Sequence, residues 1–158
     1  MKTPSQTSAA IKREAIDSMR QMPYGVLATV DSAGRPHAAT VIIVVNADLS
    51  IEFITRADTN KYRNLLKNPQ VAMAIGSTPP YAFQLRGRVR QVKAAKDVAA
   101  TMERWAEVGA KLKDIWPPIL RLGQAPYAVF RITPKTVTAI DLRSQTLNPK
   151  ALPFIKLI

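Results

Sequence analysis

Three β-rich segments follow one another closely near the start of the chain, and their short connections limit the fold most strongly. The segments are residues 24–30, 35–45 and 50–55, and each of the two connections has four residues. A parallel crossover needs a dozen or more residues, so these strands must pair antiparallel, as a meander. The first connection contains Gly34, a residue type that accepts the positive φ of a tight turn. We therefore expect a sheet built from antiparallel strands.

The rest of the chain supplies further strands with helices between them. Residues 83–89 alternate apolar and polar side chains, as a strand with one buried face does. Other segments are predicted from apolar spacing, capping residues and β-propensity. The helices are expected over residues 8–22, 58–66 (capped by Asp58) and 96–113, and the strands over residues 71–75, 127–132 and 136–142. The last two strands are expected to form a hairpin around Thr133-Pro134-Lys135.

Six or seven such strands suit a closed antiparallel barrel, because closure removes exposed strand edges. The length of 158 residues suits one domain. We expect residues 1–22 to hold an N-terminal helix, residues 23–142 to form the barrel with inserted helices, and residues 143–158 to be an irregular tail.

Several kinds of chemistry and location are excluded by what the sequence lacks. The chain has no cysteine and one histidine, so we expect no metal site, disulfide or cysteine nucleophile. His37 follows Pro36 at a strand start, where we expect it to face solvent, and no catalytic residue is assigned. No apolar run reaches the roughly 20 residues of a membrane span, and residues 1–20 lack the apolar stretch of a secretory signal. We expect a cytoplasmic protein with no membrane partner.

The net charge of +12 is the most unusual property of the composition, with 23 Lys and Arg residues against 11 acidic ones. The positive electrostatic potential of such a chain attracts anions, including nucleic acid and small phosphorylated ligands. No helix-turn-helix, zinc-finger or RNA-binding signature accompanies the charge. A basic nucleic-acid-binding barrel is therefore the least favoured interpretation.

The clearest chemical signal lies between Ile54 and Arg63, where a strand ends and a short helix begins. The N–H groups of the first helical turn lack partners within the helix and favour an anion. The surrounding side chains are hydroxyl donors, cations and an amide, a set that suits a phosphate. They are Thr55, Arg56, Thr59, Asn60 and Lys61. The same residues also suit an ordinary capped helix with a solvated basic face, so both interpretations stay open.

A second basic feature follows the strand at residues 83–89. Its polar face carries Gln84, Arg86, Arg88 and Arg90 at alternate positions, which places neighbouring side chains roughly 6–7 Å apart. Guanidinium groups at this spacing repel one another and favour an anion, acidic side chains of a partner, or water. The sequence leaves these alternatives open.

Four segments follow one another along the chain: residues 25–37 (GVLATVDSAGRPH), 53–55 (FIT), 59–72 (TNKYRNLLKNPQVA) and 85–89 (LRGRV). In this order they resemble the pyridoxamine 5′-phosphate oxidase-like family of FMN-binding split barrels. The resemblance covers residues 23–92 well and residues 127–141 more loosely. It implies a mainly β fold with inserted helices, an antiparallel split β-barrel of six to seven strands. It also implies a homodimer that holds FMN at the interface between its subunits.

The resemblance further implies which residues contact the cofactor. The strand through Thr40, Val41 and Ile42 would offer backbone hydrogen bonds to the isoalloxazine ring. Residues 54–55 match the strand-end pair that contacts the flavin tail, and residues 59–61 match the hydroxyl and basic pair on the phosphate. Gln84 lies near the family's flavin-contacting glutamine. The cofactor-binding residues expected are Thr40, Val41, Ile42, Ile54, Thr55, Arg56, Thr59, Asn60, Lys61 and Gln84.

Departures from the family pattern argue against oxidation of pyridoxamine phosphate itself. Ala39 and Val44 stand where the oxidases carry an arginine and a lysine, Asn60 replaces a usual arginine, and residues 143–158 contain no Arg-x-His element. The resemblance then implies an FMN-dependent oxidoreductase on an unidentified small substrate, with a nicotinamide nucleotide as candidate electron donor. A deazaflavin-dependent reductase and a non-catalytic flavin carrier or sensor remain the alternatives.

Overall fold

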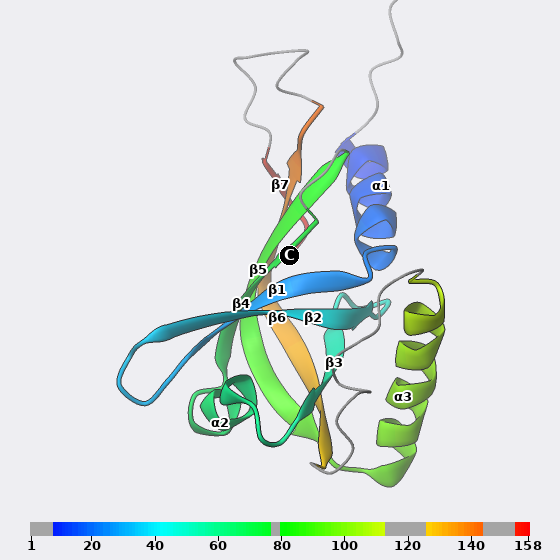
Figure 1. Ribbon diagram of the computed structural model, residues 1–158. Helices are drawn as coiled ribbons and strands as arrows, with labels where there is room; N and C mark the ends of the chain where they lie inside the picture. Colours follow the sequence, from blue (N-terminus) through cyan, green and yellow to red (C-terminus); the bar gives the residue numbers. More distant parts are fainter. Residues whose placement is uncertain (1–7, 77–79, 113–125, 144–153) are drawn as a thin grey trace, which may run out of the picture.

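The structure is a computed structural model that describes residues 8–76, 80–112, 126–143 and 154–158 (Figure 1). Its helices are α1 (Ser8–Arg20), α2 (Asn60–Lys67) and α3 (Ala95–Ala110). Its strands are β1 (Tyr24–Val30), β2 (Pro36–Val45), β3 (Ile51–Arg56), β4 (Gln70–Ile75), β5 (Tyr81–Val92), β6 (Tyr127–Asp141) and β7 (Phe154–Lys156). No helix in these ranges is long and apolar enough to cross a membrane.

The strands form one antiparallel sheet in the order β3-β2-β1-β4-β5-β6-β7. A further pairing of β3 with β6 closes the first six strands into a barrel, and β7 adds to β6 beyond the closure. The expected meander of the first three strands is confirmed by the β1–β2 and β2–β3 pairs. The mainly β, antiparallel barrel class expected from the sequence is likewise confirmed. In Figure 1 the β1–β2 hairpin projects to the left, and α3 stands on the right of the barrel.

The apolar core fills the inside of the barrel because alternate residues of every strand point inward. Leu27, Ile43 and Phe53 are fully buried there. The Phe53 and Phe130 rings stack across the β3–β6 pair with centroids 5.7 Å apart. Helices α1 and α2 contribute to the same core through residues such as Met19 and Leu65. These contacts hold α2 against the barrel wall next to the end of β3.

Helix α3 packs on the outside of the barrel, chiefly against β2 and β3. Its Trp105 is buried in a second apolar cluster with Val44, Ile54 and Val129. The outer face of this part of the sheet is therefore covered, whereas β5 keeps an exposed outer face with every second side chain in solvent.

The prediction of a hairpin around residues 133–135 is wrong, because β6 runs unbroken from Tyr127 to Asp141. A single long strand is needed here because the first half of β6 pairs with β3, the last part pairs with β7, and β5 pairs along its length. A register shift beside Gly87 accommodates Pro134 within the strand. A Cβ atom at Gly87 would lie 2.4 Å from the Thr133 carbonyl oxygen, so only glycine fits at this position.

Other element boundaries differ from the sequence expectation by smaller amounts. The tail expected to be irregular contains β7, which pairs with residues 138–140 of β6. Helix α1 ends at Arg20 rather than Met22. The cap of α2 is Thr59 rather than Asp58, because the Thr59 side chain accepts the Tyr62 N–H while Asp58 pairs with Arg56. Helix α3 ends at Ala110 rather than at residue 113.

Candidate functional site

The end of β3 and the start of α2 form a compact corner organised around two threonine hydroxyls. Thr59 Oγ1 accepts a hydrogen bond from the Tyr62 N–H at 3.3 Å and donates to the Arg56 carbonyl oxygen at 2.9 Å. The Thr55 hydroxyl oxygen lies 3.1 Å from Thr59 Oγ1. The Thr59 hydroxyl is thus used as a helix cap that ties α2 to β3, which fixes the position of the first helical turn.

Lys61 is the most distinctive residue of this corner. Its side chain is half-buried, and no hydrogen bond or ion pair joins its ammonium group to another described residue. Burial lowers the pKa of Lys61 below its ordinary value of 10.5, and the charge of nearby Asp58 only partly opposes that effect. A desolvated cation without a partner favours an anionic ligand, since the ligand would restore the electrostatic stabilisation that burial removes.

Backbone donors lie beside Lys61 at the same helix end. The N–H groups of Asn60 and Lys61 belong to the first turn of α2, where no earlier carbonyl is available within the helix. The next N–H, that of Tyr62, is already satisfied by Thr59. Two backbone donors and the Lys61 ammonium group therefore belong to the same helix end, a set of groups that suits an anion.

Two other cations of the segment are engaged within the protein. Arg56 forms an ion pair with Asp58, and this contact holds the pKa of the Asp58 carboxyl below its ordinary value. Arg63 donates to the Asp58 carbonyl oxygen at 3.0 Å and to the side-chain oxygen of Asn60. The structure thus brings all predicted corner residues together but leaves Lys61 as the cation without a partner among them.

The predicted segment Thr40–Ile42 lies in the part of β2 that is no longer paired with β3. The register of β2 with β3 ends at Ile43 and Phe53, whereas β2 remains paired with β1 as far as Pro36. The Thr40 side chain is exposed on the outer face, and Val41 belongs to the core. From Ile42 to Pro36, β2 therefore pairs with β1 and not with β3, and the corner at Thr55 follows Phe53 by two residues.

Gln84 is not close to this corner in the same chain. It lies on the outer face of β5, in one row across the sheet with Ala74, Val26 and Thr40. Eight residues separate it from Val92, whose partner on β6 adjoins the end of β3. The distance along β5 is then on the order of 26 Å. Gln84 and the corner therefore lie far apart along the strands of one chain.

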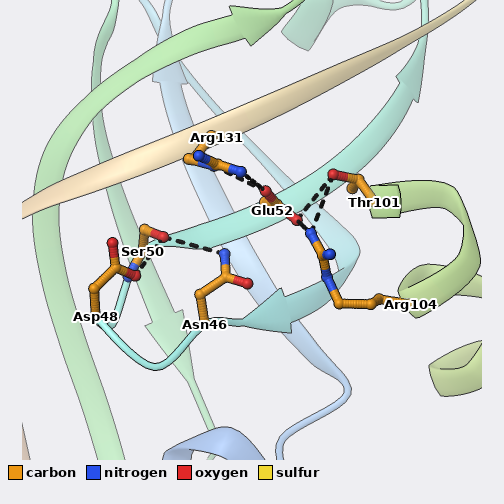
Figure 2. Close-up of polar contacts among 7 residues, drawn as sticks. All are labelled: Asn46, Asp48, Ser50, Glu52, Thr101, Arg104 and Arg131. Carbon is orange, nitrogen blue, oxygen red and sulfur yellow. Dashed lines mark hydrogen bonds and ion pairs between the residues drawn. The ribbon is translucent and has the colours of Figure 1, made fainter. Parts of the chain in front are cut away.

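A buried polar cluster beneath α3 was not expected from the sequence (Figure 2). Glu52 of β3 is fully buried and accepts hydrogen bonds from Arg131 of β6 and from Thr101 and Arg104 of α3. Burial on its own raises the pKa of Glu52, but the bonds from Arg104, Arg131 and Thr101 outweigh it, so the pKa lies below its ordinary value. The only available signal was one charged residue within the apolar run of residues 51–54.

His37 does not face solvent as expected. It is half-buried, and its Nδ1 atom is buried without a hydrogen-bond partner. Its backbone carbonyl lies opposite Thr29, whose hydroxyl accepts a hydrogen bond from the side-chain amide of Asn64 of α2.

No group of three or more potential metal ligands occurs among the residues that the structure describes.

Comparison with known proteins places this barrel and corner in a family. The family model described as pyridoxamine 5′-phosphate oxidase matches residues 11–141, which include every strand of the barrel. The chain belongs to the pyridoxamine 5′-phosphate oxidase family. The resemblance seen in the sequence segments is thereby confirmed.

One curated member of the pyridoxamine 5′-phosphate oxidase family is related in sequence. It is the pyridoxine/pyridoxamine 5′-phosphate oxidase of Anaplasma phagocytophilum (strain HZ), 31% identical over 98 residues. The match covers 60% of this chain and 48% of that protein, so the chain matches about half the length of its relative.

Solved structures of other proteins share the fold. A pyridoxamine 5′-phosphate oxidase-related, FMN-binding protein from Nostoc punctiforme PCC 73102 has a TM-score of 0.59 at 18% identity, covering 97% of this chain and 88% of that one. An F420 reductase has a TM-score of 0.55 at 23% identity, covering 77% of this chain and 94% of that one. These likenesses show that the chain shares the fold of those proteins.

Proposed function

We propose that the protein binds FMN, with the phosphate at the corner formed by the end of β3 and the start of α2. The observation that carries the proposal is Lys61, a half-buried cation with no partner among the described residues. A phosphate would accept bonds from its ammonium group and from the N–H groups of Asn60 and Lys61. The family supports this assignment, because the related Nostoc punctiforme protein is described as FMN-binding.

The isoalloxazine ring would lie along β2 at Thr40–Ile42, where the strand runs without β3 beside it. Ile54 and Thr55 at the end of β3 would contact the tail between ring and phosphate. We place the ligand at the interface of a homodimer, since Gln84 of the same chain lies too far from the corner to contact it. The exposed row through Thr40, Val26 and Gln84 is then the surface that faces the second subunit.

The activity proposed is that of a flavin-dependent oxidoreductase acting on a small substrate. FMN, when bound, supplies the hydride transfer chemistry, and the protein supplies binding and orientation. Lys61 holds the phosphate, and the Thr59 cap keeps the first turn of α2 in place. A nicotinamide nucleotide is the electron donor we propose. Ala39 and Val44 lack the charges that pyridoxamine phosphate oxidation would use, so that substrate is not proposed.

A deazaflavin-dependent reductase is the second candidate. The structural likeness to an F420 reductase supports it, since that protein shares the barrel at 23% identity. A flavin carrier without turnover uses the same site and differs only in lacking a substrate.

Three titrations of the purified apoprotein test the proposal, with FMN, riboflavin and F420 as ligands. FMN should bind at least tenfold more tightly than riboflavin, which has the same ring system and no phosphate. Equal affinity for the two overturns the phosphate site, and tight binding of F420 alone selects the second candidate. Bleaching of the bound flavin by NADH or NADPH separates an enzyme from a carrier.

A further inference from the structure

Lys61 differs from the other lysines of the protein in its surroundings. Its side chain is half-buried, whereas every other lysine in the described ranges is exposed. Burial is the main cause that lowers the pKa of Lys61 from 10.5, and the charge of Asp58 opposes that effect only in part. A lysine amine in such surroundings is neutral for a larger fraction of the time than an ordinary lysine, and the neutral amine is the nucleophilic form.

The polar side chains next to Lys61 in the sequence are already engaged with arginines. Arg56 Nε donates to Asp58 Oδ1 at 3.0 Å, and the same two side chains form an ion pair. Arg63 donates to the side-chain oxygen of Asn60. No hydrogen bond or ion pair joins the Lys61 amine to any residue that the structure describes. The amine is therefore available to react, because no carboxylate contact favours its protonated form.

The same helix end presents donors that suit a phosphate. The N–H groups of Asn60 and Lys61 begin α2 and have no carbonyl partner within the helix. In an acyl phosphate, the carbonyl carbon is joined to the phosphate through a single oxygen atom. A phosphate group bound to these donors would hold that carbon at the helix end that carries the amine. Such proximity accelerates a reaction between the two groups.

We propose that Lys61 is a modification site, acylated on Nζ by an acyl phosphate whose phosphate group binds at the corner between β3 and α2. The neutral amine attacks the carbonyl carbon and forms a new C–N bond. The bond between that carbon and the bridging oxygen breaks, inorganic phosphate leaves with the electron pair, and the amine releases one proton to water. The products are an amide and inorganic phosphate, so the step needs no oxidant, reductant or further reactant.

Acylation would regulate the site that the proposed function assigns to the FMN phosphate, and this inference rests on that assignment. The amide nitrogen carries no charge and no longer attracts a phosphate. We therefore expect the acylated protein to bind FMN at least about tenfold more weakly than the unmodified protein. Riboflavin has no phosphate, so its affinity should change little.

Acetyl phosphate and acetic anhydride, applied separately to the apoprotein, test whether a bound phosphate directs the reaction. Peptide mass spectrometry measures the acetylation rates of Lys61 and of Lys67, the matched control in the exposed last turn of the same helix. With acetyl phosphate, Lys61 should react at least about tenfold faster than Lys67. Acetic anhydride carries no phosphate, so the preference should be smaller, and added inorganic phosphate should slow Lys61 alone. An equal preference with both reagents, no preference with acetyl phosphate, or a Lys61 rate that inorganic phosphate leaves unchanged overturns the proposal.

A second measurement compares FMN affinity before and after treatment with acetyl phosphate. The wild type should lose at least about tenfold in affinity, whereas the affinity of Lys61→Arg should be the same before and after, because acetyl phosphate does not acylate a guanidinium group. No loss in the wild type, or equal losses in the two proteins, overturns the regulation. FMN titration of the untreated wild type decides the phosphate site itself. A protein that binds FMN through its phosphate and shows no preference for Lys61 overturns this inference and leaves the proposed function standing.

Discussion

Glu52 and Arg131 face each other across the β3–β6 pair that closes the barrel, and Arg131 Nε donates to Glu52 Oε1 at 2.8 Å. The same carboxylate also accepts bonds from Thr101 and Arg104 of α3. One buried side chain thus joins the closing strand pair and the helix that covers it (Figure 2). Because β3 leads directly into the corner at Thr55, this cluster also fixes the strand that carries the proposed phosphate site.

Replacing Glu52 by glutamine should lower the free energy of unfolding by about 1–3 kcal/mol. Loss of one partner from a fully buried pair costs roughly 3–5 kcal/mol, but Arg104 and Arg131 keep 40% and 29% of their side chains exposed and regain some hydration. Urea denaturation measures the change. The control Asp17→Asn removes an exposed pair and should change stability by less than about 0.5 kcal/mol. Equal effects of the two substitutions would contradict a structural role for Glu52.

The pH dependence of stability should differ between the wild type and Glu52→Gln. The folded pKa of Glu52 lies below the 4.5 that is ordinary for glutamate, so its stabilisation is complete above about pH 4.5 and is lost as the pH falls through the folded pKa. Urea midpoints measured from neutral to acidic pH should therefore converge below about pH 4.5. A constant difference between the two proteins across this range would show that Glu52 does not titrate as described.

Lys61→Ala should weaken FMN binding by about 1–3 kcal/mol, the scale of a lost charged hydrogen bond. Riboflavin binding should change little, because riboflavin carries no phosphate. Lys67→Ala is the matched control, since Lys67 is an exposed lysine in the last turn of the same helix. Isothermal titration calorimetry of the wild type and the two variants with both ligands gives the six affinities. Unchanged FMN affinity in Lys61→Ala removes Lys61 from the site.

Two glycine-to-alanine substitutions should change stability in opposite directions. Gly87→Ala places a Cβ atom 2.4 Å from the Thr133 carbonyl oxygen in a strand held on both sides, so we expect a loss of at least about 1–3 kcal/mol. Gly109→Ala adds a Cβ atom in α3 with nothing within 4 Å. It should raise stability by about 0.5–1 kcal/mol through helix propensity. Thermal unfolding of both variants measures the contrast, and a harmless Gly87→Ala would contradict the close strand approach.

Much of the candidate site was visible in the sequence because its parts are contiguous. Residues 54–63 place hydroxyls, amides and cations at a strand end and helix start, and local propensity is sufficient to predict both elements. The sequence could not predict which cations form ion pairs within the protein. Arg56 pairs with Asp58, whereas Lys61 has no ion-pair partner among the described residues. That division depends on side-chain geometry and burial, which no residue spacing specifies.

The sequence by itself determined the antiparallel meander and the alternating face of β5, because short connections and two-residue periodicity are local properties. Only the tertiary structure decided that β6 is one strand that pairs with β3, β5 and β7, and that Pro134 lies within it opposite Gly87. Only the tertiary structure, too, placed Glu52 under α3 and Gln84 far from the corner. These outcomes depend on pairing between residues distant in the chain, and the free energy of such pairing is set by the closed barrel rather than by any one segment.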